Sequence, residues 1–485
     1  MNAKAVMVLG TTSGAGKSWL ATALCRWYAR QGLRVAPFKA QNMSNNARVV
    51  PGLGGRSGEM GSAQYFQALA ARSEPEVRMN PVLLKPESDT ASQVVVLGDV
   101  REDLAHVPWR ERSEMLWPHA RDALRFLMAY HDVVVIEGAG SPAEINLHAS
   151  DYVNMRTALE AEAACLLVTD IDRGGAFAHL YGTHQLLAAR ERALLRGFVL
   201  NRFRGDAALL APGPQRLQEL TGVATLAVLP MWRGHGLPEE DGVFDETARR
   251  SGEGRRIAIV AYPRISNLDE FQPLRHAEGV RLSWARQPAD LESADLVILP
   301  GSKHTCGDLG WLREQRLDLA IGRHIEAGKP VLGICGGLQM LGESLSDPHG
   351  VDGDAAGLGI LPLRTVFDRD KLLRSTGARF ASTGGVWSAL AGVPVSGYEI
   401  RHGRTSGDGA NAELRVALRN DQGEPIGWQK GQVLGVCLHG LFESAKVMQA
   451  LLGASHRSLD SVFDGLADFV EVHFVAGALA RLIEE

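Results

Sequence analysis

The sequence predicts an α/β protein of two domains, each built around a sheet of mainly parallel strands. Three observations predict it: short apolar runs alternate with longer helical patterns, a polar and glycine-rich stretch interrupts the alternation, and the alternation then restarts. We expect domains at 1–233 and 255–485, joined by a linker at 234–254. With 485 residues, of which 45% are hydrophobic and 6% aromatic, the chain has enough apolar material for two cores.

The apolar runs are short, rich in β-branched residues and bounded by glycine or charge, as in strands buried on both faces of a parallel sheet. The first half predicts a doubly wound parallel sheet with a helix near 16–31. The closing segment from residue 459 predicts one or two amphipathic helices packed on the last sheet. The expected strands are 5–9, 34–38, 132–136, 163–168, 196–200 and 223–229, then 256–262, 295–301, 330–334 and 433–439.

Charge and cysteine usage exclude several functional classes. The net charge of -5 does not favour binding to nucleic acid or to an anionic membrane. The five cysteines are scattered and form no C-x-x-C pair, which argues against a disulfide framework and a structural zinc site. No stretch approaches the roughly 20 apolar residues of a membrane span, and the apolar N-terminal run is too short for a signal peptide. We expect a cytoplasmic protein that acts on small molecules.

GTTSGAGKS (10–18) follows the first strand and opens the first helix, which is the context that a phosphate-binding loop requires. Gly14 and Gly16 allow backbone N–H groups to point at phosphate, and the helix N-terminus adds a favourable dipole. Lys17 can reach the outer phosphates and the Ser18 hydroxyl can hold Mg²⁺. We expect ATP at this loop, with one departure: five residues, not the usual four, separate the first glycine from Gly16.

This spacing resembles the loop of dethiobiotin synthetase, an ATP-dependent enzyme that activates a carboxylated substrate. VVVIEGAG (133–140) resembles that family's acidic segment, which implies that Glu137 holds Mg²⁺. VLNRF places Asn201 where the family's asparagine binds the nucleotide base. Lys39, after the second strand, could steady an acyl phosphate or the substrate carboxylate. From the residues alone, Glu137 could equally cap a helix, Asn201 could belong to a turn, and Lys39 could be solvated.

Cys335, in GICGGLQ (333–339), lies where an expected strand meets an expected helix. Small neighbours suit the strained turn of a nucleophile elbow, which presents the side chain at the carboxyl end of the sheet. The N–H of Gly336 could then face the reacting carbonyl. The alternative is a buried cysteine that serves only for packing.

Residues at the ends of two other expected strands favour the interpretation of Cys335 as a nucleophile over the packing alternative. His439 ends an expected strand and could take the thiol proton. PGSKH follows another strand, and the N–H of Gly301 or Ser302 could complete an oxyanion hole. Together the three stretches resemble a class I, triad-type glutamine amidotransferase domain over residues 255–485.

The third member of the triad departs from that pattern. Class I domains have an acid two residues after the histidine, whereas Leu441 stands there and Glu443 is the nearest acid. A backbone carbonyl could orient His439 in its place. In GYEIRHGRT, Tyr398 and Glu399 could hold glutamine or stand near His439, but a surface turn explains them equally well.

The whole chain resembles the cobyric and cobyrinic acid synthase family. GTTSGAGKS, KAQNMSNNA, TDIDRGGAFA, GYEIRHGRT, GICGGLQMLG and LHGLFE carry the resemblance. It implies amidation of the b, d, e and g carboxylates of adenosylcobyrinic acid a,c-diamide, with glutamine, ATP and Mg²⁺. Asp170, in TDIDRGG, would then meet ATP or the corrin, although a helix-capping role is comparable.

Three alternatives stay open at this point. The related cobyrinic acid a,c-diamide synthase amidates other carboxylates, and a murein-precursor amidating ligase uses the same plan in two separate chains. From another class, the chain could be a partitioning ATPase with an inactive glutaminase-like domain. Such ATPases carry a signature lysine where Thr12 stands, and they need no elbow cysteine.

Overall fold

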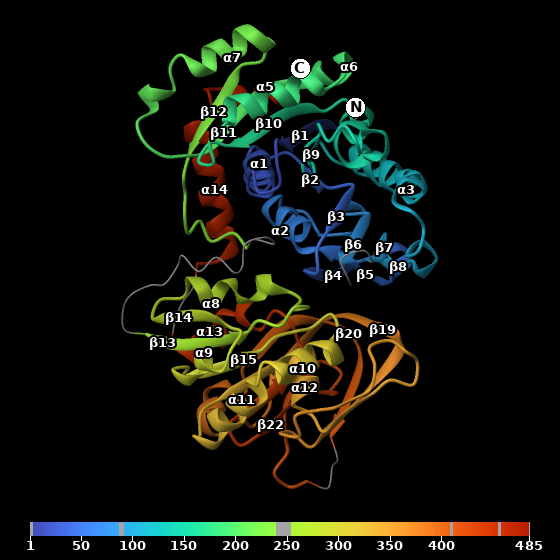
Figure 1. Cartoon of the computed structure of the whole chain (residues 1–485), viewed down its shortest axis with the longest axis vertical. Helices are drawn as coiled ribbons and strands as arrows, with labels where there is room; N and C mark the ends of the chain where they lie inside the picture. Colours follow the sequence, from blue (N-terminus) through green and yellow to red (C-terminus); the bar gives the residue numbers. More distant parts are fainter. Residues whose placement is uncertain (1–2, 87–91, 239–253, 408–410, 454–456, 485) are drawn as a thin grey trace. The chain divides into compact units, whose positions relative to one another are not determined.

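A computed structural model of the chain describes residues 3–86, 92–238, 254–407, 411–453 and 457–484. The described residues form two compact units (Figure 1). The first unit draws on Met1–Ser44, Val50–Asp241 and Arg457–Glu485, and the second on Asn45–Val49 and Gly242–His456. Both units are α/β, as the sequence predicts.

The main sheet of the first unit is parallel, and its six described strands are ordered β12-β11-β10-β1-β9-β2. It is buried on both faces, because Val6 and Val8 of β1 belong to one apolar cluster while Met7 and Leu9 belong to another. Smaller strands form separate sheets. The strands are β1 Lys4–Gly10, β2 Val35–Phe38, β9 Val133–Glu137, β10 Ala164–Asp170, β11 Leu195–Phe203 and β12 Thr225–Pro230, with β3 Gln41–Met43, β4 Ala47–Pro51, β5 Ser57–Gly61, β6 Val82–Pro86, β7 Ser92–Val96 and β8 Asp99–Val100 in the smaller sheets.

Helices cover both faces of this sheet. One apolar cluster contains residues of α1 and α14, and the other contains residues of α3 and α5. This is the doubly wound arrangement that the sequence predicts. The helices of the first unit are α1 Lys17–Arg30, α2 Ser62–Ala70, α3 Trp109–Tyr130, α4 Thr157–Glu160, α5 Ala176–Leu186, α6 Ala189–Arg192, α7 Gly213–Thr221, α14 Leu459–His473 and α15 Ala478–Glu484.

The C-terminal helices correct the expected extent of the second domain, 255–485. We expected them on the last sheet, but α14 packs against α1 and belongs to the first unit (Figure 1). The buried Arg26 of α1 donates to Asp460 at 3.0 Å and to Asp464 at 2.7 Å. A buried guanidinium needs such partners, so these ion pairs fix where α14 lies. Of the predicted linker, residues 239–253 lie outside the described residues.

The second unit has one sheet with a parallel half and an antiparallel half. Strands β14-β13-β15-β16-β23 run parallel, and β22, β21, β19 and β20 continue the sheet in antiparallel pairs. The sequence predicts each of the neighbouring strands β13, β15, β16 and β23 as a short apolar run. It does not predict the antiparallel part, because strands such as β19 mix buried and exposed residues and contain no continuous apolar run. The strands are β13 Arg255–Val260, β14 Val280–Ala285, β15 Leu296–Leu299, β16 Val331–Ile334, β17 Ser344–Ser346, β18 Ala355–Ala356, β19 Leu363–Phe380, β20 Pro394–Gly407, β21 Arg415–Asn420, β22 Pro425–Lys430 and β23 Val433–Val436.

The turn from β16 into α12 is packed directly against β15. A Cβ at Gly337 would lie 2.0 Å from the carbonyl oxygen of Leu299, so the backbone of the helix start can approach the strand only if this residue is glycine. This close approach fixes α12 against the sheet. The helices of this unit are α8 Gln272–His276, α9 Ala289–Glu292, α10 Thr305–Glu314, α11 Leu317–Glu326, α12 Gly336–Leu341 and α13 Ala445–Leu452.

Replacing Gly337 by Ala is expected to lower the free energy of unfolding by about 1–3 kcal/mol or more, because backbone atoms must move to admit the methyl group. The measurement is urea-induced unfolding followed by circular dichroism. Gly310→Ala is the matched control, since Gly310 lies in α10 with nothing within 4 Å of an added Cβ. The control should be neutral or more stable by about 0.5–1 kcal/mol, and equal losses in both variants would contradict the packing explanation.

Candidate active sites

The phosphate-binding loop lies between β1 and α1 in the first unit. Gly14 and Gly16 have positive φ angles of 72° and 99°, which glycine adopts without strain. A Cβ at Gly16 would also lie 2.1 Å from Nδ2 of Asn201. This amide donates to the carbonyl oxygen of Ala15 at 2.9 Å. The structure therefore brings Asn201, at the end of β11, against the loop where the sequence predicts ATP.

Lys17 and Ser18 open α1. The ammonium of Lys17 donates to the carbonyl oxygens of Thr12 and Gly140, at 3.0 Å each, and so stays beside the loop. The Ser18 hydroxyl donates to Glu137 at 2.8 Å. The loop thus presents a cation and a hydroxyl next to the N-terminus of a helix of 14 residues, an arrangement suited to phosphate.

Glu137, at the end of β9, is buried, and both of its carboxylate oxygens accept hydrogen bonds. Besides the Ser18 hydroxyl, its carboxylate accepts hydrogen bonds from Lys39 at 2.8 Å and from Gln67 at 2.6 Å. Burial raises the pKa of Glu137, but the charge of Lys39 and these hydrogen bonds outweigh burial and hold the pKa below its ordinary value. The carboxylate is therefore ionised. A hydroxyl and a carboxylate in contact are hard oxygen ligands that fit Mg²⁺, which takes its other ligands from phosphate and water.

Asp170 and Lys39, which are both candidate substrate residues, have different ion-pair partners. It lies beside Asn201 in the register of β10 and β11, and its carboxylate pairs with Arg202 at 2.9 Å and with Arg173 at 3.4 Å. The sequence groups Lys39 and Asp170 as substrate or acyl-phosphate residues, whereas the structure places Lys39 on Glu137 and Asp170 in an ion-pair cluster with two arginines. Asp170 also accepts from the N–H of Asp172 at 3.0 Å.

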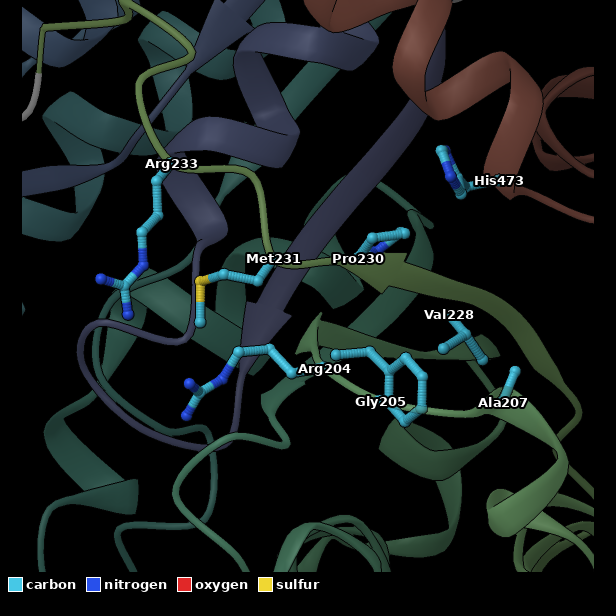
Figure 2. A pocket seen from close by; sticks show the side chains of 9 residues that line it. Arg204, Gly205, Ala207, Val228, Pro230, Met231, Arg233 and His473 are labelled. Atoms are coloured by element: carbon cyan, nitrogen blue, oxygen red, sulfur yellow. The ribbon is translucent and has the colours of Figure 1, made fainter.

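A cavity of about 710 Å³ lies at the carboxyl ends of β11 and β12. Figure 2 shows Arg204, Met231 and Arg233 among its walls, and Val228 and Pro230 add apolar surface. Ligands of open α/β sheets bind outside the carboxyl ends of the strands. Apolar walls with two guanidinium groups suit a planar or apolar group that carries negative charge.

In the second unit, Cys335 forms the sharp turn predicted for a nucleophile elbow. It connects β16 to α12 with φ 49° and ψ -106°, a conformation that costs a non-glycine residue about 1–3 kcal/mol. The thiol lies 3.7 Å from the carbonyl oxygen of Ile400. A strained turn at the carboxyl end of a parallel strand is the geometry expected for a nucleophile.

The turn after β15 meets the elbow. A Cβ at Gly336 would lie 2.8 Å from the backbone nitrogen of Ser302, and a Cβ at Gly301 would lie 2.8 Å from Cε1 of His439. The backbone of Gly336 therefore lies against that of Ser302, and Gly301 lies beside His439, so the stretches predicted to form an oxyanion hole are neighbours. The Ser302 hydroxyl donates at 2.6 Å to Asp308, which anchors the turn. Burial raises the pKa of Asp308 to about 6.

His439 contacts an acid that the sequence did not predict. Its Nδ1 lies 3.1 Å from Oε1 of Glu270, and the N–H of Gly440 donates to the other carboxylate oxygen at 3.2 Å. Glu270 is fully buried in the 3₁₀ helix η8 (Leu268–Phe271). Glu443, the nearest acid in sequence, instead pairs with Arg48 at 2.6 Å. The available signal was position alone: ISNLDEF closely follows β13, a strand of the same sheet.

The pKa of His439 reflects its two charged neighbours. Burial lowers this pKa, but the charges of Glu270 and Cys335, and the hydrogen bonds to both, raise it to about 10. The imidazole is therefore protonated between a carboxylate and a sulfur that can ionise. This arrangement can hold a thiolate for attack and deliver a proton to a leaving group.

The GYEIRHGRT segment belongs to β20, so it is a strand and not a surface turn. Tyr398 stacks on His439, with ring centroids 5.4 Å apart, and the two residues exchange backbone hydrogen bonds. Glu399 is fully buried and pairs with Arg374 at 2.6 Å and with Arg401 at 2.7 Å. Tyr398 therefore helps to orient the imidazole ring.

Comparisons with known proteins match a family model to each part of the chain. Residues 6–233 match the model of the CobQ/CobB/MinD/ParA nucleotide binding domain, and residues 256–447 match the model of the CobB/CobQ-like glutamine amidotransferase domain. A protein named cobyric acid synthase from Methylibium petroleiphilum is 72% identical, with 100% of this chain and 97% of the relative aligned. One of the same name from Variovorax paradoxus is 65% identical, with 100% of both chains aligned.

The chain belongs to the cobyric acid synthase family. Its first unit accordingly contains a nucleotide-binding domain and its second a glutamine amidotransferase domain of the type found in the cobyric acid synthase family. Among the described helices, none has the length and apolar character needed to cross a membrane.

Replacing Glu270 by Gln is expected to move the alkaline limit of glutamine hydrolysis to lower pH. Glu270 raises the pKa of His439, so its removal lowers that pKa, and the imidazolium that protonates the departing ammonia is lost at a lower pH. We also expect kcat to fall by about 10²-fold or more. The measurement is glutamate release as a function of pH.

Glu443→Gln provides the comparison, since Glu443 is the nearest acid in sequence but pairs with Arg48. Its alkaline limit should stay near that of the wild type, and its loss of kcat should be smaller. If Glu443→Gln shifted the limit and Glu270→Gln did not, the assignment of Glu270 as the partner of His439 would be wrong.

Proposed function

We propose that the protein amidates the b, d, e and g side-chain carboxylates of adenosylcobyrinic acid a,c-diamide to give adenosylcobyric acid, using ATP, Mg²⁺ and glutamine. One observation carries the proposal: relatives named cobyric acid synthase match the chain over its whole length at up to 72% identity. The full-length match favours this reaction over the a,c-diamide synthase and over a partitioning ATPase. The elbow cysteine with its histidine supports an enzyme that releases ammonia from glutamine. With these substrates, we expect the reaction in the cytoplasm.

In the first half-reaction, a corrin carboxylate attacks the γ-phosphorus of ATP, and ADP leaves as the acyl phosphate forms. The loop N–H groups and Lys17 would bind the phosphates, and Asn201, which donates to the carbonyl oxygen of Ala15 in the loop, would contact the nucleotide. Ser18 and Glu137 would hold Mg²⁺, which neutralises phosphate charge when bound. Lys39, held on Glu137, would steady the carboxylate or the acyl phosphate.

In the second half-reaction, the sulfur of Cys335 attacks the carboxamide of glutamine. The protonated His439 would stabilise the attacking thiolate and give its proton to the departing ammonia, while the N–H groups of Gly336 and the Gly301 turn would stabilise the oxyanion. Water then hydrolyses the thioester to glutamate. Ammonia displaces inorganic phosphate from the acyl phosphate to leave the amide. Free ammonia is needed, because ammonium has no lone pair for this attack.

Cys335→Ala is expected to abolish glutamine-dependent amidation and to retain amidation supported by ammonium salt. The measurement follows product masses with adenosylcobyrinic acid a,c-diamide, MgATP and either nitrogen donor. Cys306→Ala is the control, and it should use both donors. If no corrin changes mass with either donor in the wild type, the substrate assignment falls. If Cys335→Ala still uses glutamine, Cys335 serves only for packing.

Glu137→Gln is expected to abolish amidation with both nitrogen donors, by about 10²-fold or more, because it removes the ionised oxygen ligand proposed for Mg²⁺ and the partner of Lys39. Glutamate release from glutamine alone should persist, since Glu137 belongs to the first unit. The same mass assay and a glutamate assay measure both effects. Full amidation by Glu137→Gln would contradict its role in holding MgATP.

A further inference from the structure

Residues Asn45–Val49 belong to the second unit, although the chain on both sides of them belongs to the first. The segment carries Arg48, whose side chain is only 2% exposed. An arginine is almost never fully buried unless it is paired, so its partners show what the buried guanidinium does.

The backbone and side chains of this segment hold the loop that leads into η8. The N–H of Ala47 donates to Oδ1 of Asn267 at 3.0 Å, and the side-chain oxygen of Asn46 accepts from the N–H of Leu268 at 2.8 Å. Asn267 has a positive φ of 54°, an uncommon conformation that these hydrogen bonds support. Since η8 carries Glu270, the segment fixes the start of the element that presents the carboxylate to His439.

Arg48 contacts three residues that flank the Glu270–His439 pair. It forms a buried ion pair with Asp269, the neighbour of Glu270, and a second ion pair with Glu443 at 2.6 Å. Its guanidinium also lies 5.0 Å from the ring centroid of Tyr398, which stacks on His439. One guanidinium therefore contacts both the neighbour of Glu270 and the tyrosine that stacks on the imidazole of His439.

The charges at this point explain why an arginine is needed. The buried Asp269 and Glu270 and the partly buried Glu443 bring three carboxyl groups close together, and desolvation raises the pKa of Glu443. A guanidinium can pair with two carboxylates at fixed angles and stack on an aromatic ring at the same time, which an ammonium group cannot do equally well.

We propose that Arg48 is a positioning residue of the glutaminase site: it fixes η8 and Tyr398 so that the carboxylate of Glu270 stays in hydrogen-bonding contact with the imidazole of His439. The inference rests on the proposed function of Cys335 and His439 in glutamine hydrolysis. The contacts described for Arg48 are with Asp269, Glu443 and Tyr398, so it acts through neighbours of the glutamate and the imidazole. A residue of this kind changes kcat more than the KM for glutamine.

The test compares Arg48→Met, Arg48→Lys and Arg26→Met in the full-length protein. Glutamate release is measured with glutamine alone and again with MgATP and the corrin diamide. Arg48→Met should lower kcat by about 10²-fold, with KM changed less than about threefold. Arg48→Lys should recover part of this loss, because it restores the charge without the fork of two donors.

Arg26→Met is the matched control, since Arg26 is also 2% exposed and also pairs with two carboxylates, but in the first unit. It should lose stability without losing glutamate release. The pH profile separates positioning from a general loss of structure: when Glu270 is no longer held on His439, the alkaline limit moves to lower pH. Loss of a nearby positive charge alone would move it to higher pH.

Arg48→Met with wild-type kcat, or with an alkaline limit that is unchanged or higher, would overturn the inference and leave the proposed function intact. Wild-type protein that releases no glutamate under either condition would overturn both. Amidation supported by ammonium salt should be the same in Arg48→Met as in the wild type. If Arg48→Met lost this amidation as well as glutamate release, a role confined to the glutaminase site would be wrong.

Discussion

Burial of a carboxylate together with its cation is the constraint on which both sites depend. Glu137 is 1% exposed and remains ionised because Lys39 reaches it, and Glu270 is fully buried against the imidazole of His439. An isolated buried charge would be too costly, so each pair must be placed accurately by the strands that lead to it and, for Glu270, by the 3₁₀ helix η8. Parallel strands do this because their carboxyl ends lie along one edge of the sheet.

The features predictable from sequence are those that a short stretch of chain determines. The glycine loop, the elbow at Cys335 and the buried parallel strands each carry a local pattern, whether a spacing, a turn or a continuous apolar run. The end of an expected strand also indicated His439 as a candidate, whereas Glu137 and Asn201 were identified through the resemblance to dethiobiotin synthetase. The pairing of β19 with β20 gave no such signal, since most of their residues are exposed or only partly buried and no apolar run marks them.

What the sequence could not predict depends on contacts between distant residues. Glu270 reaches His439 across 169 positions of sequence, and Arg26 reaches Asp464 across 438. No spacing rule connects such positions. Amphipathic helices such as α14 show which face is apolar but not which surface covers it; in the structure, apolar packing on α1 and the ion pairs of Arg26 and Arg30 hold α14 in place.

The path of the chain has a consequence for how such an enzyme can be divided. The backbone enters the second unit at Asn45, leaves it after Val49, returns within the predicted linker and ends in the first unit. A fragment that begins at residue 255 would keep Asp269 and Glu443 but lack Arg48, and it would carry α14 without α1. If the two activities were divided into separate chains at this point, the N-terminal chain would have to supply Arg48 to the glutaminase, and the C-terminal chain would have to supply α14 to α1.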